Sequence, residues 1–341
     1  RTSLKNSSRF SFTFIFFIAC AQNNTATGFV IEGIKLHDKG DYSGAIALYK
    51  KALGIDNKLS QANYELASSY FAIKEYNKVV AYCNKVIAAR SNYIDQAYIL
   101  KGSAQDLLGN PKIAVTTYKE AIKKYPANSL LYYNLALTAF NLKNYKETDD
   151  ALENSLKLNP AHASSHLLLG HSMGKQGNGV KSILALSNFL LIEPTGTRAE
   201  TALQFLESEL KKGTSNGNEN ETAITVPQQK KSDGFSTAGI ILSLFESSRT
   251  NEANKNKTSY QFFTEQMKSL FITLGELKKD NTSFWWTYYV DFFYALTHKG
   301  YVEAFSYYIT QSKKDKNIDN WLQSNKEVYD AFANWYVSYK R

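Results

Sequence analysis

The stretch Tyr133 to Asn159, YNLALTAFNLKNYKETDDALENSLKLN, decides the fold of this chain. Two segments rich in apolar residues flank the polar turn Lys143-Asn144-Tyr145, which predicts a helix, a short turn and a second helix. The stretch Gly40 to Leu53, GDYSGAIALYKKAL, repeats the turn and the second helix much earlier in the chain. A recurring helical hairpin therefore predicts the architecture before any single helix is assigned.

Small residues recur with a period of 34 or 35 residues, at Gly33, Ala67, Gly102, Ala136 and Gly170. Two further registers keep these intervals: Ala45, Val79, Ala114, Thr148 and Ser182, then Tyr49, Cys83, Tyr118, Leu152 and Leu186. Prolines that cannot continue a helix close the last three copies, at Pro126, Pro160 and Pro194. The period predicts five stacked hairpins, in which Gly or Ala on the first helix lets the second helix approach closely.

This pattern resembles the tetratricopeptide repeat over residues 26–194. Asn57 and Ser91 stand where the terminating proline is usual, and Thr148 and Ser182 replace the usual alanine. The resemblance implies an all-α solenoid of about five hairpins, curled into a superhelix whose first helices line a concave groove. We therefore expect a scaffold that binds other proteins.

The resemblance also indicates which side chains line this protein-binding groove. They are Gln61, Tyr64, Ser68, Phe71, Gln96, Ser103, Asp106, Tyr133, Asn134, Phe140, Asn141, His171 and Lys175. Such a mixture of aromatic and amide side chains favours a peptide segment held by ring stacking and amide hydrogen bonds. Packing between helices is the competing explanation for each tyrosine and phenylalanine.

Some tetratricopeptide proteins clamp an acidic peptide C-terminus through Lys and Asn on these helices. Here the first repeat offers Val30 and Ile34 at the corresponding positions, and the second repeat offers no groove lysine. We therefore expect no carboxylate clamp.

Beyond the repeats, Thr197 to Lys212 predicts an amphipathic helix that caps the solenoid. Residues 213–234 are rich in Asn, Ser, Thr and Gln, which is typical of a polar linker. Residues 235–341 predict a C-terminal helical domain whose five helices are Phe235 to Ser248, Tyr260 to Lys279, Phe284 to His298, Tyr301 to Ser312 and Ile318 to Tyr339. The turn at His298 to Ala304 is similar to the turns of the repeats.

Residues 284–341 carry eighteen aromatic residues, including all four tryptophans. Exposed rings stack on sugars and dominate protein interfaces, whereas rings at helical spacing usually fill a core. We expect a core, because many of these rings share one helical face. Trp286, Tyr288 and Phe293 cannot all lie on the buried face of an α-helix, which makes them candidates for a C-terminal interface.

The first nineteen residues have the pattern of a secretory signal peptide. Arg1, Lys5 and Arg9 precede an apolar run from Phe10 to Ala19 that is too short to span a bilayer. Phe17 to Cys20 resembles a bacterial lipobox, in which cleavage leaves a lipidated Cys20 and a short tether, residues 20–25. Cleavage after Ala21 is the alternative and would release a soluble chain.

The net charge of +9 comes from dispersed basic residues in an ordinary folded composition. Two cysteines exclude a disulfide framework and a Cys-rich zinc site. Nucleic acid is not an expected partner of an exported chain, and anionic membrane lipid is easier to reach.

No catalytic constellation, phosphate-binding loop or metal motif is present in the sequence. His162 and His166 lie four residues apart but lack the glutamate of a metalloprotease helix, so we expect them to face solvent or the groove. We expect no enzyme activity, no cofactor, no metal and no small-molecule ligand.

Together these patterns predict an exported scaffold lipoprotein that mediates protein–protein interactions in a bacterial cell-envelope complex, on the outer membrane. A lipid anchor followed at once by five repeats is similar to the lipoprotein component of the outer-membrane protein assembly machinery. The alternative is a glycan- or peptidoglycan-binding accessory lipoprotein that uses the aromatic C-terminal region.

Overall fold

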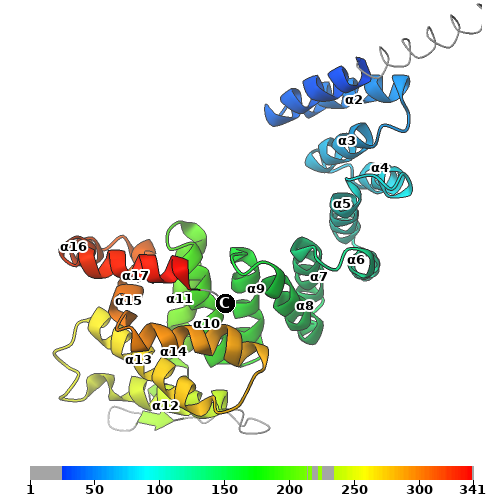
Figure 1. Ribbon diagram of the computed structural model, residues 1–341. Helices are drawn as coiled ribbons and strands as arrows, with labels where there is room; N and C mark the ends of the chain where they lie inside the picture. Colours follow the sequence, from blue (N-terminus) through cyan, green and yellow to red (C-terminus); the bar gives the residue numbers. More distant parts are fainter. Residues whose placement is uncertain (1–24, 213, 217–221, 225–233, 340–341) are drawn as a thin grey trace, which may run out of the picture. The chain divides into compact units, whose positions relative to one another are not determined.

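The computed structural model describes residues 25–212, 214–216, 222–224 and 234–339 (Figure 1). The predicted signal peptide and the predicted lipidation site Cys20 lie outside these residues. The chain forms two compact units, which we call unit 1, up to Asn144, and unit 2, from Tyr145 onward. Nearly all of the described structure is helical, which confirms the all-α fold class.

Unit 1 is a succession of helical hairpins. In its described part the helices are residues 25–38, α2 (Tyr42–Ile55), α3 (Ser60–Ala72), α4 (Tyr76–Ala88), α5 (Ile94–Leu107), α6 (Pro111–Lys124) and α7 (Ser129–Asn141). From α2 onward each helix contacts the next, and α5 also contacts α3 and α7. Neighbouring helices therefore supply the stabilisation, as expected for stacked repeats.

The small residues of the first register allow the close contact within each hairpin. A methyl group at Gly102 would overlap the ring of Tyr118, which is fully buried. In unit 2 a Cβ at Gly170 would lie 2.7 Å from Cγ of Leu186, at the same two register positions. The packing predicted from the repeat registers is therefore confirmed.

The turn inside each hairpin places one residue in the left-handed backbone region. These residues are Gly40, Lys74, Gly109, Lys143 and Gly177, with φ of 83°, 64°, 80°, 58° and 77°. Glycine adopts this conformation freely, whereas the Cβ of a lysine is crowded there. Two of the five turns are therefore strained.

Unit 2 begins inside the fourth repeat and continues to the C-terminal helices. Its first helices are α8 (Tyr145–Leu158), α9 (Ala163–Lys175), α10 (Gly179–Ile192) and α11 (Thr197–Lys211). Two short strands, β1 (Thr214–Asn216) and β2 (Thr222–Ile224), pair antiparallel inside the segment predicted to be a linker. The remaining elements are α12 (Phe235–Ser247), η1 (Ser248–Thr250), α13 (Ser259–Leu277), η2 (Trp285–Val290), α14 (Asp291–His298), α15 (Val302–Ile309), η3 (Gln311–Lys313), α16 (Lys316–Ser324) and α17 (Lys326–Ser338).

Helix α10 forms the centre of unit 2. It contacts α9, α11, α12, α15 and η2, and it buries every residue from Ser182 to Leu191. Its sequence, GVKSILALSNFLLI, is mostly apolar and carries a single charged residue, and such a helix requires neighbours on most of its sides. The C-terminal helices, predicted to form a separate domain behind a linker, therefore pack on the fifth repeat instead.

One predicted C-terminal helix is two helices in the structure. The predicted helix Ile318 to Tyr339 is interrupted at Asn325, with φ of −117° and ψ of 34°, between α16 and α17. Asparagine competes with the helical backbone for hydrogen bonds, which favours a break at this position. Helix α17 then buries Phe332 beside Tyr301 and Tyr308.

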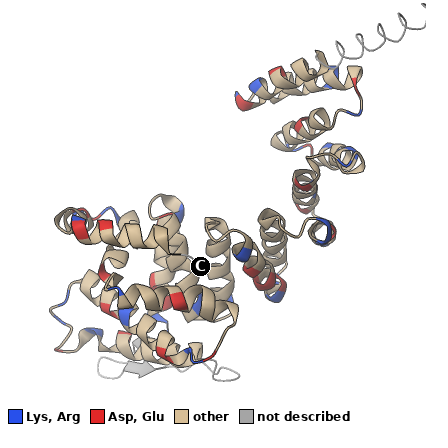
Figure 2. Ribbon diagram, in the orientation of Figure 1, with Lys and Arg blue, Asp and Glu red and all other residues tan. Residues whose placement is uncertain are grey.

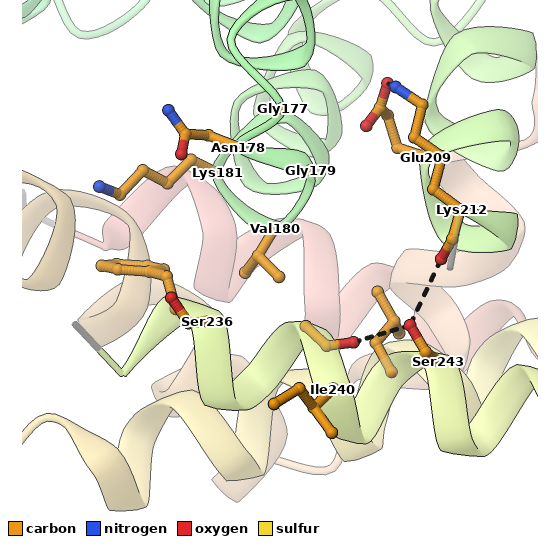
Figure 3. A pocket seen from close by; sticks show the side chains of 13 residues that line it. Gly177, Asn178, Gly179, Val180, Lys181, Glu209, Lys212, Ser236, Ile240 and Ser243 are labelled. Carbon is orange, nitrogen blue, oxygen red and sulfur yellow. Dashed lines mark hydrogen bonds and ion pairs between the residues drawn. The ribbon is translucent and has the colours of Figure 1, made fainter. Parts of the chain in front are cut away.

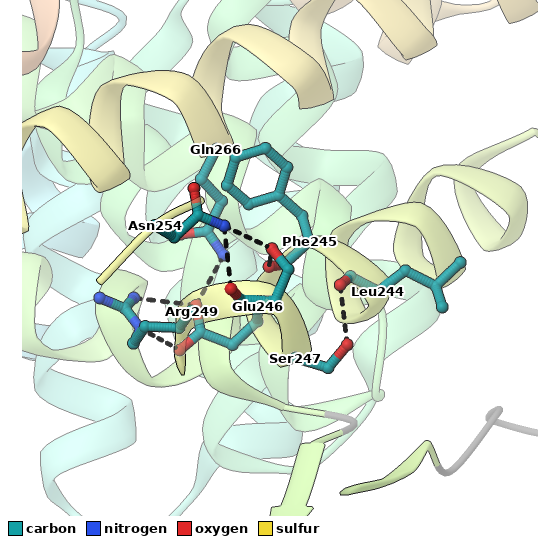
Figure 4. Close-up of polar contacts among 8 residues, drawn as sticks. Leu244, Phe245, Glu246, Ser247, Arg249, Asn254 and Gln266 are labelled. Atoms are coloured by element: carbon teal, nitrogen blue, oxygen red, sulfur yellow. Dashed lines mark hydrogen bonds and ion pairs between the residues drawn. The ribbon is translucent and has the colours of Figure 1, made fainter. Parts of the chain in front are cut away.

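A buried carboxylate joins α12 to α13 (Figure 4). Arg249 donates two hydrogen bonds to Glu246, at 2.8 and 2.9 Å, and Gln266 donates a third at 3.0 Å. The guanidinium of Arg249 also lies 4.0 Å from the centroid of the Phe262 ring. The charge of Glu246 is thus compensated where it is buried, and the network fixes how α12 packs on α13.

Candidate protein-binding surface

Eleven of the predicted groove residues lie on α3, α5 and α7 of unit 1, and we call the surface that they form the first-helix surface. None of the eleven is buried, and Gln96 and Asn141 are the most exposed. The other two, His171 and Lys175, lie on α9 in unit 2. The first-helix surface is therefore open to solvent at every predicted position.

Two aromatic rings of this surface pack against neighbouring rings and are also partly exposed to solvent. Tyr64 stacks on Tyr93 with 5.4 Å between the ring centroids, and Phe71 meets the edge of Tyr76 at 5.6 Å. Both Tyr64 and Phe71 nevertheless stay partly exposed. Packing thus fixes the orientation of each ring and leaves part of it free for a ligand.

Two polar residues of this surface also hold helices together. Ser103 Oγ lies 3.1 Å from the hydroxyl of Tyr118, within the third hairpin. Thr138 on α7 donates a hydrogen bond of 2.9 Å to Asp106 on α5. Asp106 therefore links two successive first helices in addition to facing solvent.

Helix α7 also exposes two apolar residues that were not among the predicted groove residues. Leu130 is 44% exposed and Leu137 is 37% exposed, and both follow the helical spacing of the predicted residues Tyr133 and Phe140. The sequence feature that could have indicated an apolar surface is that SLLYYNLALTAFN contains no charged residue. In contrast, Val30, expected on this surface in the first repeat, is fully buried, because it packs in the hydrophobic core of unit 1.

The first helices of unit 1 carry more acidic than basic residues. Within residues 25–38, α3, α5 and α7 there are five Asp or Glu and two Lys. Burial and the nearby charge of Asp38 raise the pKa of Glu65. Two carboxylates that repel each other favour a cationic group on a bound partner.

The two predicted residues on α9, His171 and Lys175, lie in unit 2, where His171 contacts another aromatic ring. The ring of His171 lies 4.9 Å from that of Phe205, between centroids. Burial, and then the positive charge of Lys175, lower the pKa of His171. Burial therefore favours the neutral form of this imidazole, whereas Lys175 is exposed to solvent.

His166 was expected to face solvent or the groove, and this prediction is wrong. The residue is fully buried. Its Nδ1 lies 2.8 Å from the hydroxyl of Tyr289, and its Nε2 lies 3.0 Å from the carbonyl oxygen of Pro160. Both ring nitrogens are thus engaged, because the C-terminal helices cover this side of the fifth repeat.

Trp286, Tyr288 and Phe293 were predicted as candidates for a C-terminal interface, and this prediction is also wrong because all three are buried. Their exposed fractions are 3%, 8% and 1%. The physical reason is the π-helix η2, whose wider turn departs from the α-helical spacing and leaves only Thr287 outside.

Each of the three rings has a structural contact. Trp286 packs 4.5 Å from Phe235, and Phe293 stacks on Phe271 at 4.4 Å, between centroids. The hydroxyl of Tyr288 lies 3.3 Å from the carbonyl oxygen of Pro160. These three rings therefore belong to the core of unit 2.

Unit 2 also contains a cavity of about 270 Å³ between α10, α11 and α12 (Figure 3). Glu209, which is buried and paired with Lys212, lines it together with Val180, Phe235 and Ile240. The volume lies below the range of roughly 300–1,000 Å³ that is usual for small-molecule sites. We assign no ligand to this cavity.

In the described part of the chain, no three His, Cys, Asp or Glu side chains gather as a metal site would require. Within the same residues, no helix has the length and apolar character that a membrane span needs.

Comparison with known proteins identifies the repeats. Family models described as tetratricopeptide repeat match residues 36–103, 96–128 and 117–149. The chain is 27% identical to the BBSome complex member BBS4 of Bos taurus over 139 residues, which are 41% of this chain and 26% of that protein. It is 29% identical to the small glutamine-rich tetratricopeptide repeat-containing protein 2 of Saccharomyces cerevisiae over 136 residues, or 38% of each chain.

The match therefore spans well under half the length of these curated relatives. Among solved structures, the chain resembles YrrB, a TPR protein with an unusual peptide-binding site, at 19% identity and a TM-score of 0.42. That similarity covers 52% of this chain and 90% of YrrB. Tetratricopeptide repeats mediate protein–protein interactions. The matched repeats identify this chain as a tetratricopeptide repeat protein.

Proposed function

We propose that the first-helix surface of unit 1 docks a segment of a partner protein and that the chain acts as an interaction scaffold. The observation that carries this proposal is the exposure of aromatic, amide and leucine side chains along α3, α5 and α7. Leu130 and Leu137 alone leave about two fifths of their surfaces to solvent on one helix. Apolar surface of this kind favours a binding partner over water.

The chemistry of this surface indicates what kind of segment fits. Tyr133, Phe140 and the two exposed leucines favour an amphipathic segment with apolar anchors. The excess of carboxylates on the first helices, with Asp38 and Glu65 close together, favours Lys or Arg beside those anchors. A segment with an apolar face and basic flanks is therefore the expected ligand.

A paired substitution tests this docking surface. Leu130→Gln with Leu137→Gln removes the exposed anchors of α7, and the matched control is Leu158→Gln with Leu244→Gln, at residues of similar exposure on α8 and α12. Partners are captured by cross-linking in cell envelopes and identified by mass spectrometry. We expect the α7 pair to lower capture of one partner at least tenfold and the control to preserve it.

Unchanged capture by the α7 pair would contradict the proposal. Equal loss in both pairs would also contradict it, because binding would then not depend on the first-helix surface. Circular dichroism of all variants verifies that the helical content is preserved.

We also propose that the chain is exported and anchored by a lipid on Cys20 in a bacterial cell envelope, on the outer membrane. The basic start, the apolar run to Ala19 and the following cysteine support this proposal. Cys20→Ser should abolish labelling by a fatty acid analogue and release the chain from membranes. Labelling that persists in this variant would overturn the lipid anchor, whereas cleavage after Ala21 would give an unlabelled soluble chain from the start.

A further inference from the structure

The second helices of the three hairpins in unit 1 form a strongly basic surface. Helices α2, α4 and α6 together carry one acidic residue, Glu120, and eight lysines: Lys50, Lys51, Lys78, Lys85, Lys112, Lys119, Lys123 and Lys124. All eight are exposed. Figure 2 colours Lys and Arg blue and Asp and Glu red along the chain. We call this surface the lysine face.

The lysine face is not a general feature of the repeats. The next second helix, α8, carries four acidic residues and only two lysines, and α10 carries a single lysine. The first helices of unit 1 are acidic on balance. Positive charge is therefore concentrated on one set of helices in one unit, which favours a specific role over simple solubility.

Ion pairs within the protein compensate only part of this charge. Lys78 pairs with Glu75 at 3.3 Å, and Lys124 pairs with Glu120 at 2.8 Å. For five other lysines, the described residues contain no ion pair: Lys50, Lys51, Lys85, Lys112 and Lys123.

Apolar groups accompany these ammonium groups. Lys85 Nζ lies 4.5 Å from the centroid of the Tyr82 ring, and Lys51 Nζ lies 5.8 Å from that of Phe29. Ile113, next to Lys112, is 52% exposed, and Ile55 at the end of α2 is 37% exposed. A lysine-rich surface with exposed isoleucines matches the interface of a bilayer, where charged heads meet acyl chains.

We propose that the lysine face docks unit 1 on a bilayer surface that contains anionic phospholipid. Its charge is complementary to such a surface, which attracts each nearby lysine. Helices α2, α4 and α6 contain no arginine, the residue that recognises phosphates and bases bidentately, so a diffuse layer of headgroup charge fits better than a nucleic acid.

The short stretch of chain between Cys20 and unit 1 also favours a bilayer as the partner of the lysine face. The first described helix begins at residue 25, five positions after Cys20, and five extended residue steps span at most about 18 Å. The choice of a bilayer thus rests on the proposed membrane attachment. A lipid on Cys20 would keep the start of unit 1 close to the membrane, so that lysines of the lysine face could come within a Debye length of the headgroups, where their charge is not fully screened.

Vesicle binding tests this proposal without the lipid anchor. The protein is the chain from residue 20 with Cys20→Ser, which keeps every described residue and carries no acyl group. Its sedimentation is measured with phosphatidylcholine vesicles that contain either 30% phosphatidylglycerol or none. We expect binding to the anionic vesicles only, and we expect it to weaken steeply from 50 to 300 mM salt.

A charge-matched pair of variants locates the surface. Substitution of Lys50, Lys85, Lys112 and Lys123 by Gln should lower the partition coefficient about 100- to 1,000-fold. The control substitutes Lys268, Lys279, Lys299 and Lys316, which are exposed lysines of unit 2, by Gln and should bind nearly as the parent does.

Three results would overturn the proposal: no binding to anionic vesicles, equal binding to neutral vesicles, or equal loss in both variants. Binding to a DNA duplex or self-association, without binding to vesicles, would assign the lysine face to another partner and overturn the proposal as well. None of these results bears on acylation of Cys20 or on partner capture by α7, so a failure of this proposal can be distinguished from a failure of the proposed function.

Discussion

Both units are built from the same helical hairpin, but unit 1 leaves helix surfaces open to solvent and unit 2 buries them. In unit 1 the described helices contact mainly their neighbours in sequence, so the first-helix surface and the lysine face both stay open. In unit 2 other helices surround α10 on most of its sides, and large rings such as Tyr289, Phe271 and Phe293 are fully buried. The difference teaches that aromatic content alone does not mark a binding site, because what matters is how many neighbours a helix has.

The largest expected effect is the loss of a ring from the core of unit 2. Phe293→Ala should lower the free energy of unfolding of unit 2 by about 3–5 kcal/mol, since Phe293 is 1% exposed and stacks on Phe271. Urea unfolding followed by tryptophan fluorescence measures this directly, because all four tryptophans lie in unit 2.

The comparison variant is Phe71→Ala in unit 1, where the ring is only half-buried. Circular dichroism should show a smaller loss, about 1–2 kcal/mol. A cost for Phe293→Ala no larger than that for Phe71→Ala would remove the distinction between the two units.

A second prediction concerns the close contact inside the hairpins. Gly102→Ala should destabilise unit 1 by about 1–3 kcal/mol, because the new methyl group would overlap the Tyr118 ring. Gly54→Ala on α2 is the control, since nothing lies within 4 Å of its Cβ position, and it should stabilise by up to about 1 kcal/mol. Thermal unfolding followed at 222 nm measures both, and a neutral Gly102→Ala would refute the packing role of the first register.

A third prediction uses the strained turns. Lys74→Gly should stabilise unit 1 by about 0.5–1 kcal/mol, because glycine adopts a φ of 64° without steric cost. Gly109→Ala, at the equivalent turn position with a φ of 80°, should destabilise by a similar amount. The same sign for both variants in chemical denaturation would show that the turn conformation does not limit stability.

The smallest expected effect is a pH dependence confined to unit 2. Burial, reinforced by Arg198 and Lys175, lowers the pKa values of His162 and His171 below the ordinary 6.5. The unfolded state then binds more protons, so the stability of unit 2 should fall as the pH drops below about 6.5. His162→Gln with His171→Gln should flatten this part of the fluorescence-detected profile, whereas His298→Gln, at an exposed position, should leave it unchanged.

The sequence predicts the repeated part well because its period is local and redundant. The register that pairs Gly102 with Tyr118 is confirmed by their contact, and Gly40 marks a turn that requires a positive φ. Asp106 was found as a surface residue, but its bond to Thr138 depends on how successive repeats stack, which no single repeat reveals. The exposed leucines of α7 were missed because leucine at helical spacing usually indicates a core.

The C-terminal region is less predictable for two physical reasons. A helical wheel assumes 3.6 residues per turn, and the π-helix at Trp285–Val290 breaks this assumption. His166 and Tyr289 meet only because distant segments pack on α10, which a local pattern does not report. Local periodicity predicts hairpins, but it does not predict which hairpins receive additional neighbours.

Site-specific photo-cross-linking tests most directly whether unit 1 binds and unit 2 is a packed core. A photoreactive phenylalanine analogue is placed at Asn141 or Gln96, on the first-helix surface, or at Val337, which is 85% exposed on α17. We expect one partner protein to be cross-linked at Asn141 and at Gln96, and not at Val337. Attachment at Val337, with none at either first-helix position, would contradict this expectation.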